Sequence, residues 1–309
     1  MTREFSDIRN AFEERRNFFR NVQVWPTREE FDCEGWIDNF SGDEEKFLAT
    51  KMLSDFLYFP KKMLDRLFYD SVGSAIARIQ SRFKDFSADF YKKNIIYSYI
   101  PGENSNPSDS GYTFVKKARD FLHVPEENLC HFSDLQDTIL RGGMWPCAIV
   151  FCDDFVGSGC QCIDALSRRD SDGVSLYEHA KRRGCILAYA PLIANVDGIE
   201  RIRTGLPELI CTPIYKLGRE YNLFERECLC WEGDEGLFKA GCELILEKSK
   251  HLGIPDNGGE TVSARGFYNQ GMFIGFEDGI PDCDPAIFYF SDKRWTPLMR
   301  KNYDRSGMR

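Results

Sequence analysis

Features that would place the chain in a membrane or outside the cell are missing from the sequence. No apolar run is long enough to span a bilayer, and Met1 to Arg16 lack the apolar segment of a signal peptide. The net charge is −9, from 40 Lys and Arg against 49 Asp and Glu, which disfavours broad attraction to nucleic acid or anionic lipid. We therefore expect a cytoplasmic protein without membrane contact, and direct nucleic-acid binding is not indicated.

Signatures of several enzyme classes are also missing. The chain has four histidines, all isolated in sequence, and a lone histidine is more often structural than catalytic. They are His123, His131, His179 and His251. The Gly157-Ser158-Gly159 turn lacks the Lys-Ser/Thr pair and the glycine spacing of a Walker loop, and Gly-x-Ser-x-Gly is not present there. The sequence therefore assigns no general base, and the catalytic residues stay unknown.

Twelve cysteines raise the question of disulfides or bound metal. In a cytosolic chain of 309 residues we expect reduced thiols, several of them small core residues within apolar runs. Cys160-x-Cys162 and Cys228-x-Cys230 lack the usual two-residue gap of a zinc site, and no companion pair follows. The sequence predicts no protein-bound metal.

The most informative stretch runs from Cys147 to Gln161. It reads as a buried strand, the acidic pair Asp153-Asp154, a tight turn with Gly157 and Gly159, and the start of a helix. Open α/β sheets bind ligands at the carboxyl ends of their strands, and backbone amides at the start of the following helix can hold a phosphate. A strand-end acidic pair that caps the next helix or holds a structural cation is the plainer alternative.

This stretch resembles the phosphoribosyl-pyrophosphate (PRPP) motif of type I phosphoribosyltransferases. The resemblance implies that Asp153 and Asp154 bind the ribose hydroxyls and that the loop after them binds the 5′-phosphate. The implied phosphate-binding residues are Phe155, Val156, Gly157, Ser158, Gly159, Cys160 and Gln161. Ser158 stands where the family usually has Thr, and Gln161 replaces a second Thr or Ser.

A polar loop precedes this motif, from Gly102 to Gly111. In the resembled superfamily a loop in this relative position binds pyrophosphate, which implies that role for Ser108, Ser110 and Gly111. A plain surface connection fits the composition equally well. The resemblance also implies Mg²⁺ bound with the substrate, and Mg²⁺ needs no dedicated protein cage because it prefers substrate phosphates.

A wider resemblance covers most of the chain. Trp25-Pro26 and Trp36, the acidic pair, Asp278-Gly279-Ile280-Pro281 and Trp295-Thr296-Pro297-Leu298 resemble a phosphoribosyltransferase-like family of bacterial anti-phage systems, some of them retrons. The resemblance implies a defence effector with protein partners from the same system. Two functions stay open: a phosphoribosyltransferase (a glycosyltransferase) or N-glycosidic-bond-cleaving enzyme, and a noncatalytic nucleotide sensor or scaffold.

Strand and helix patterns alternate through the middle of the chain. Strands are expected at 94–100, 147–152, 185–190 and 209–215, with helices at 112–122, 161–166, 176–183 and 196–203. This order predicts an α/β fold with a doubly wound, mainly parallel sheet at residues 91–309. Residues 1–90 read as an N-terminal helical extension, and strands are expected again from about residue 260, one of which could extend the sheet's edge.

Overall fold

The computed structural model describes residues 2–82, 94–102, 110–141, 148–259, 262–277 and 279–300. The chain divides into two compact units: unit 1 is Met1–Met63 with Gly218–Arg309, and unit 2 is Leu64–Leu217. These bounds differ from the expected division at residue 90. The N-terminal helices share one hydrophobic core with the C-terminal segment, so the two ends of the chain form one unit.

Unit 2 is built on a parallel sheet. Its strands are β2 (Ile95–Tyr99), β3 (Ala148–Val156), β4 (Ile186–Asn195), β5 (Ile210–Cys211) and β6 (Tyr215–Leu217). The spatial order is β2-β3-β4-β5, and β6 also pairs with β4, further along that strand. All pairings within this sheet are parallel, and every residue of β2 and β4 is buried. The mixed α/β fold with a mainly parallel sheet is confirmed.

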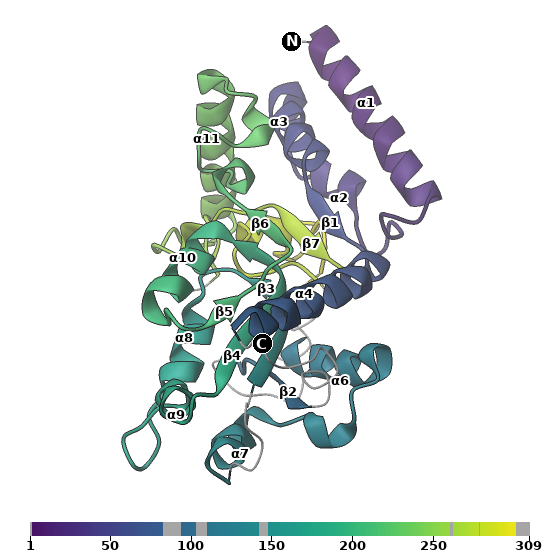
Figure 1. Cartoon of the computed structure of the whole chain (residues 1–309). Coiled ribbons are helices and arrows are strands. Elements are labelled where there is room, and N and C mark those ends of the chain that lie inside the picture. The colour runs from purple at the N-terminus through teal and green to yellow at the C-terminus, as the bar shows by residue number, and fades with distance from the viewer. Residues whose placement is uncertain are drawn as a thin grey trace. The chain divides into compact units, whose positions relative to one another are not determined.

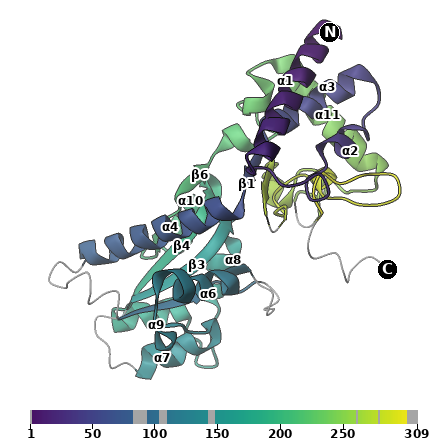
Figure 2. The ribbon, with the colours of Figure 1, turned by 90° about the vertical axis from the view of Figure 1, so that its right-hand side faces the viewer.

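Helices cover both faces of this sheet (Figures 1 and 2). One face carries α4 (Lys61–Arg82) and α6 (Ser110–Leu122), where the Ser71 hydroxyl donates to the Pro191 carbonyl of β4. The other face carries α7 (Leu135–Arg141), α8 (Cys160–Ser167), α9 (Leu176–Arg183) and α10 (Val196–Gly205), whose apolar residues form one core with the strands. Both faces are covered, which accounts for the apolar first half of β3 and for the full burial of β2 and β4.

One expected strand of unit 2 is observed in two pieces, and the long helix α4 is continuous. α4 runs unbroken from Lys61 to Arg82 although it contains Gly73 and Ser74, a pair at which helices can kink. The strand expected at 209–215 is observed as β5 and β6, with Pro213 between them. Proline has no N–H to donate to a ladder, and this edge position tolerates the break.

Unit 1 combines helices with a two-stranded parallel sheet. The helices are α1 (Thr2–Asn21), α2 (Cys33–Ile37), α3 (Gly42–Ser54) and α11 (Glu235–His251), and the strands are β1 (Leu57–Phe59) and β7 (Ile274–Phe276). Among the described residues of both units, short 3₁₀ segments are η1 (Glu126–Asn128), η2 (Phe132–Asp134), η3 (Arg219–Tyr221), η4 (Leu229–Trp231), η5 (Phe267–Asn269) and η6 (Ala286–Phe288). No helix in the described ranges is both long and apolar enough to cross a membrane.

A strand expected after residue 260 is observed as β7, but the expectation that it could extend the edge of the main sheet is wrong. β7 pairs with β1 in the small sheet, so it does not extend the edge of the main sheet. The apolar run at 286–290 lies in the region from about residue 260 where strands are expected, and it contains the 3₁₀ segment η6. Pro285 directly precedes η6 with φ of −51°, which suits a helical turn.

Two of the three tryptophans that carried the wider resemblance meet in unit 1. The indole N–H groups of Trp36 and Trp295 both donate to the Ile287 carbonyl, at 2.9 and 2.8 Å. The Asp32 amide donates to the Leu298 carbonyl at 2.8 Å. The segments around Trp36 and Trp295 are far apart in sequence, yet they pack together in one buried core.

Candidate functional site

The acidic pair lies inside β3 rather than in the loop after it. β4 continues alongside to Asn195, so Phe155 still pairs with Ile193 and Val156 with Ala194. Successive side chains of a strand point to opposite faces, which separates the two carboxylates. Asp153 and Asp154 therefore have different surroundings although they are adjacent in sequence.

Asp153 is buried, with only 5% of the residue exposed. The Tyr189 hydroxyl donates to Asp153 Oδ2 at 2.5 Å, and the Asp154 amide donates to Asp153 Oδ1 at 3.0 Å. Burial and the neighbouring Asp154 carboxylate raise the pKa of Asp153 well above its usual range, and the Tyr189 hydrogen bond opposes that rise. The carboxyl group of Asp153 is thus held by the protein itself.

Asp154 is partly exposed. Its Oδ1 accepts a hydrogen bond from the Phe155 amide at 2.8 Å. This bond fixes the carboxylate near the carboxyl end of β3. Of the two acids, Asp153 is buried and Asp154 is partly exposed.

The loop after β3 turns two consecutive carbonyls toward α10. A Cβ atom placed on Gly198 would lie 2.1 Å from the Gly157 carbonyl oxygen, and the Ser158 carbonyl accepts a hydrogen bond from Arg201. In a planar trans peptide the N–H points opposite to the carbonyl. The amides of Ser158 and Gly159 therefore point away from α10, and neither donates a hydrogen bond within the described part of the chain.

Gly159 is the last residue of the loop and directly precedes α8. Its φ of +77° lies in the left-handed region, and a Cβ there would lie 2.6 Å from the Gly198 carbonyl oxygen. The Ser158 hydroxyl accepts from the Cys160 amide at 3.3 Å, and the N-cap residue of α8 is Gly159. The loop is thus a tight turn with donors at the first turn of α8, a geometry that suits an anion.

Gln161 connects this loop to the end of β2. Its side-chain amide donates to the carbonyls of Pro101 and Ile100, at 3.2 and 3.4 Å. The structure therefore gives the amide two main-chain partners, and the phosphate contact expected for Gln161 stays a prediction.

The expected pyrophosphate residues are only partly described. Ser108 lies outside the described residues, Ser110 begins α6, and Gly111 follows it in the same helix. Since α6 is the helix that follows β2 in the chain, it begins beyond the carboxyl end of that strand. The pyrophosphate role of these residues stays a prediction.

The cysteine pairs lie in different units. Cys228 and Cys230 are buried in unit 1 with their sulfur atoms 3.4 Å apart, while Cys160 and Cys162 begin α8 in unit 2. Among the residues the structure describes, His, Cys, Asp and Glu side chains do not assemble into a group of three that could hold a metal ion.

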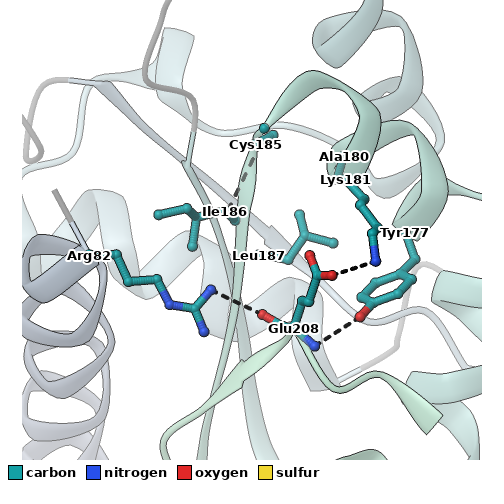
Figure 3. Close-up of a pocket in the computed structure, with 9 residues that line it drawn as sticks. Arg82, Tyr177, Ala180, Lys181, Cys185, Ile186, Leu187 and Glu208 are labelled. Carbon is teal, nitrogen blue, oxygen red and sulfur yellow. Dashed lines mark hydrogen bonds and ion pairs between the residues drawn. The ribbon is translucent and has the colours of Figure 1, made fainter.

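A pocket of about 190 Å³ lies elsewhere in unit 2 (Figure 3). Its lining includes Cys185 to Leu187 at the start of β4, whereas Asp154 lies near the end of β3, so the pocket and the acidic pair are at opposite ends of these parallel strands. Lys181 and Glu208 form an ion pair of 2.5 Å at its rim. The pocket contains none of the residues expected to bind ribose or phosphate.

Three residues that support the candidate site were not identified from the sequence. Tyr189 lies in an apolar strand with no signal of a polar role, and Arg201 is one of several charged residues of α10. Gly198 had a signal: a glycine inside a helix usually has a packing reason. None of the three is near Asp153 in the chain, so only the fold brings them together.

Comparison with known proteins agrees with this fold. The PRTase-CE family model matches residues 33–301, which is most of the chain and includes β3, the loop and both tryptophan regions of unit 1 that meet at Ile287. No curated protein and no solved structure matches the chain. The chain therefore belongs to the PRTase-CE family of phosphoribosyltransferase-like proteins.

Proposed function

We propose that the protein binds PRPP or a related ribose 5-phosphate nucleotide at the carboxyl end of β3. One observation carries the proposal: two amides, of Ser158 and Gly159, face away from α10 within five residues of the partly exposed Asp154 carboxylate. Amides suit a phosphate and a carboxylate suits sugar hydroxyls. A ligand that carries both groups on one ribose matches this pair.

The two acids then have separate tasks. Asp154 accepts hydrogen bonds from the ribose hydroxyls, because it has solvent access. Asp153 holds the adjacent backbone through the Asp154 amide, and Tyr189 keeps Asp153 in that position. This assignment refines the expectation that both carboxylates bind the ribose directly.

If the bound ligand reacts, the bond between the anomeric carbon and the pyrophosphate oxygen breaks and a bond to an acceptor atom forms. The chain's residues position the ribose and phosphate, which is the main protein contribution to such a transfer. Mg²⁺, when bound with the substrate, would neutralise the phosphate charge, and the oxygen ligand Asp154 fits its preference for carboxylate and phosphate oxygens.

A noncatalytic nucleotide sensor or scaffold is the second candidate. Two observations favour it: the buried, protein-held carboxyl of Asp153 and the main-chain bonds of Gln161. With the Asp153 carboxyl and the Gln161 amide bound by the protein itself, the site has fewer side chains to bind a ribose phosphate than an efficient transferase would use. Fold alone does not decide between the two candidates.

Calorimetric titration with PRPP and Mg²⁺ tests the proposed binding. Asp154→Asn should weaken binding by roughly 10- to 100-fold, since a hydrogen bond to a charged group contributes about 1.5–3 kcal/mol. Asp164→Asn, on the exposed side of α8, is the matched control and should bind like the wild type. No binding of PRPP by the wild type at millimolar concentration would refute the proposal, and pyrophosphate release with a nucleobase acceptor would favour the enzyme over the sensor.

We also propose an effector role in anti-phage defence, based on the wider resemblance. Neighbouring genes should then include a reverse transcriptase, a helix-turn-helix protein or another defence component that acts as a partner. A plaque assay with the intact gene cluster should lose protection when Asp154→Asn is introduced. A setting among purine or pyrimidine salvage genes would contradict this role.

A further inference from the structure

Arg201 of α10 lies against the loop that follows β3. Its guanidinium donates to the Ser158 carbonyl and to the Cys160 sulfur, the latter at 3.8 Å. The close approach of Gly198 to the Gly157 carbonyl brings α10 near enough for these contacts. A single side chain from the next crossover helix thus touches both ends of the turn at the start of α8.

The hydrogen bond to the Ser158 carbonyl has a defined effect on the loop. It holds the peptide between Ser158 and Gly159 with its oxygen toward α10, so the Gly159 amide points to the opposite side. Without this donor, the left-handed Gly159 could rotate, because glycine has access to many backbone conformations.

The guanidinium also places a permanent positive charge against the carbonyl side of the Ser158–Gly159 peptide. Arginine stays protonated at all relevant pH values. The charge adds to the positive potential of the N-terminus of α8, where an anion is favoured. Arg203, two residues on, instead forms an exposed ion pair with Glu200 at 3.2 Å within α10.

We infer that Arg201 is a positioning residue that sets the affinity of this loop for the 5′-phosphate of the ligand. The inference rests on the proposed function. Arg201 acts through the Ser158–Gly159 peptide and through its charge, from the side of the loop opposite to the amides. It therefore needs no direct contact with the ligand.

Calorimetry of Arg201→Gln, Arg201→Lys and the control Arg203→Gln tests this role, with PRPP and Mg²⁺ and with ribose 5-phosphate as ligands. Arg201→Gln should weaken the binding of both ligands by roughly three- to tenfold at low salt, since it removes a charge and a charge-assisted hydrogen bond. The loss should shrink at high salt, because Arg201 is exposed and its field is screened. Arg201→Lys should recover part of the affinity, and Arg203→Gln should bind like the wild type.

The outcomes separate this inference from the proposed function. If the wild type binds neither ligand at millimolar concentration, both fail. If the wild type binds and Arg201→Gln binds equally well, only the role of Arg201 fails. A loss that is independent of salt and not recovered by Arg201→Lys would show a purely structural role and also overturn the inference. Should Arg201→Gln not fold, Arg201→Lys is compared with the wild type instead. Weaker binding by Arg201→Lys would support the positioning role, and equal affinity at all salt concentrations would overturn the inference that the hydrogen bond from Arg201 to the Ser158 carbonyl sets the affinity of the loop.

Discussion

Gly198 occupies a position where the structure leaves no room for a side chain. It lies in the first turn of α10, and a Cβ atom there would lie 2.1 Å from the Gly157 carbonyl oxygen and 3.1 Å from the carbonyl carbon. Both atoms belong to the backbone of the loop that we propose binds phosphate. Gly198→Ala must therefore displace either α10 or the loop.

The size of the effect follows from two opposing contributions. Alanine in a helix is favoured over glycine by up to about 1 kcal/mol. Forcing an extra carbon into a packed contact typically costs about 1–3 kcal/mol, and a backbone neighbour cannot swing aside as a flexible side chain can. We expect a net loss of about 1–2 kcal/mol, which corresponds to a fall of roughly 2–8 °C in the melting temperature of a protein with units of this size.

Thermal melting and PRPP calorimetry together check this prediction, with Gly73→Ala as the control. Gly73 lies inside α4 with no atom within 4 Å of its Cβ position, so Gly73→Ala should raise stability by up to about 1 kcal/mol through helix propensity alone. Gly198→Ala should melt below the wild type and bind PRPP more weakly. If Gly198→Ala instead melts above the wild type by as much as Gly73→Ala does, the close contact between α10 and the loop does not exist.

Three further substitutions test the packing and charges of the two units. Burial raises the pKa of Asp284 in the folded protein well above its ordinary value of 3.8. The folded protein therefore loses stability as the pH rises from 3.8 through the folded-state pKa. Asp284→Asn should melt above the wild type at pH 8, and its melting temperature should vary less with pH. Gly241→Ala would place a carbon 2.1 Å from the Trp231 ring, so we expect a loss of about 1–3 kcal/mol by denaturant unfolding, and unchanged stability would contradict this packing. Hydrogen bonds from His179 and from the Val174 amide lower the pKa of Asp170 to about 2. The contribution of Asp170 to stability is therefore present above pH 3.8 and is lost as the pH falls toward 2. Asp170→Ala should lower the melting temperature at pH 7 and speed hydrogen exchange of the Val174 amide, whereas wild-type exchange there would show that Asp170 does not hold the turn.

Much of unit 2 was predictable because its signals are local. The apolar run before Asp153, the two glycines and the helical pattern after Cys160 are each short-range features, and β3, the turn and α8 follow them. The strand at 94–100 and the helix at 176–183 were found for the same reason. The acidic pair and the loop were therefore identified as a candidate site from the sequence alone.

The unequal surroundings of the acidic pair could not be predicted in this way. Asp153 and Asp154 have the same side chain and adjacent positions, and their difference depends on β4 continuing beside β3 and on Tyr189, 36 residues away in the chain. The support of the loop by Gly198 and Arg201 depends likewise on where α10 packs. Such contacts have no local pattern, because they are set by strand register and helix packing.

The sequence by itself determined the fold class, the position of the acidic pair at a strand end and the glycine turn after it, since periodicity and glycine act over a few residues. Only the tertiary structure decided that the two chain ends form one unit around the Ile287 carbonyl, that one carboxyl is buried while its neighbour meets solvent, and that α10 orients the loop. Burial and hydrogen bonding between distant segments are properties of the packed chain, and they control charge and access at the site.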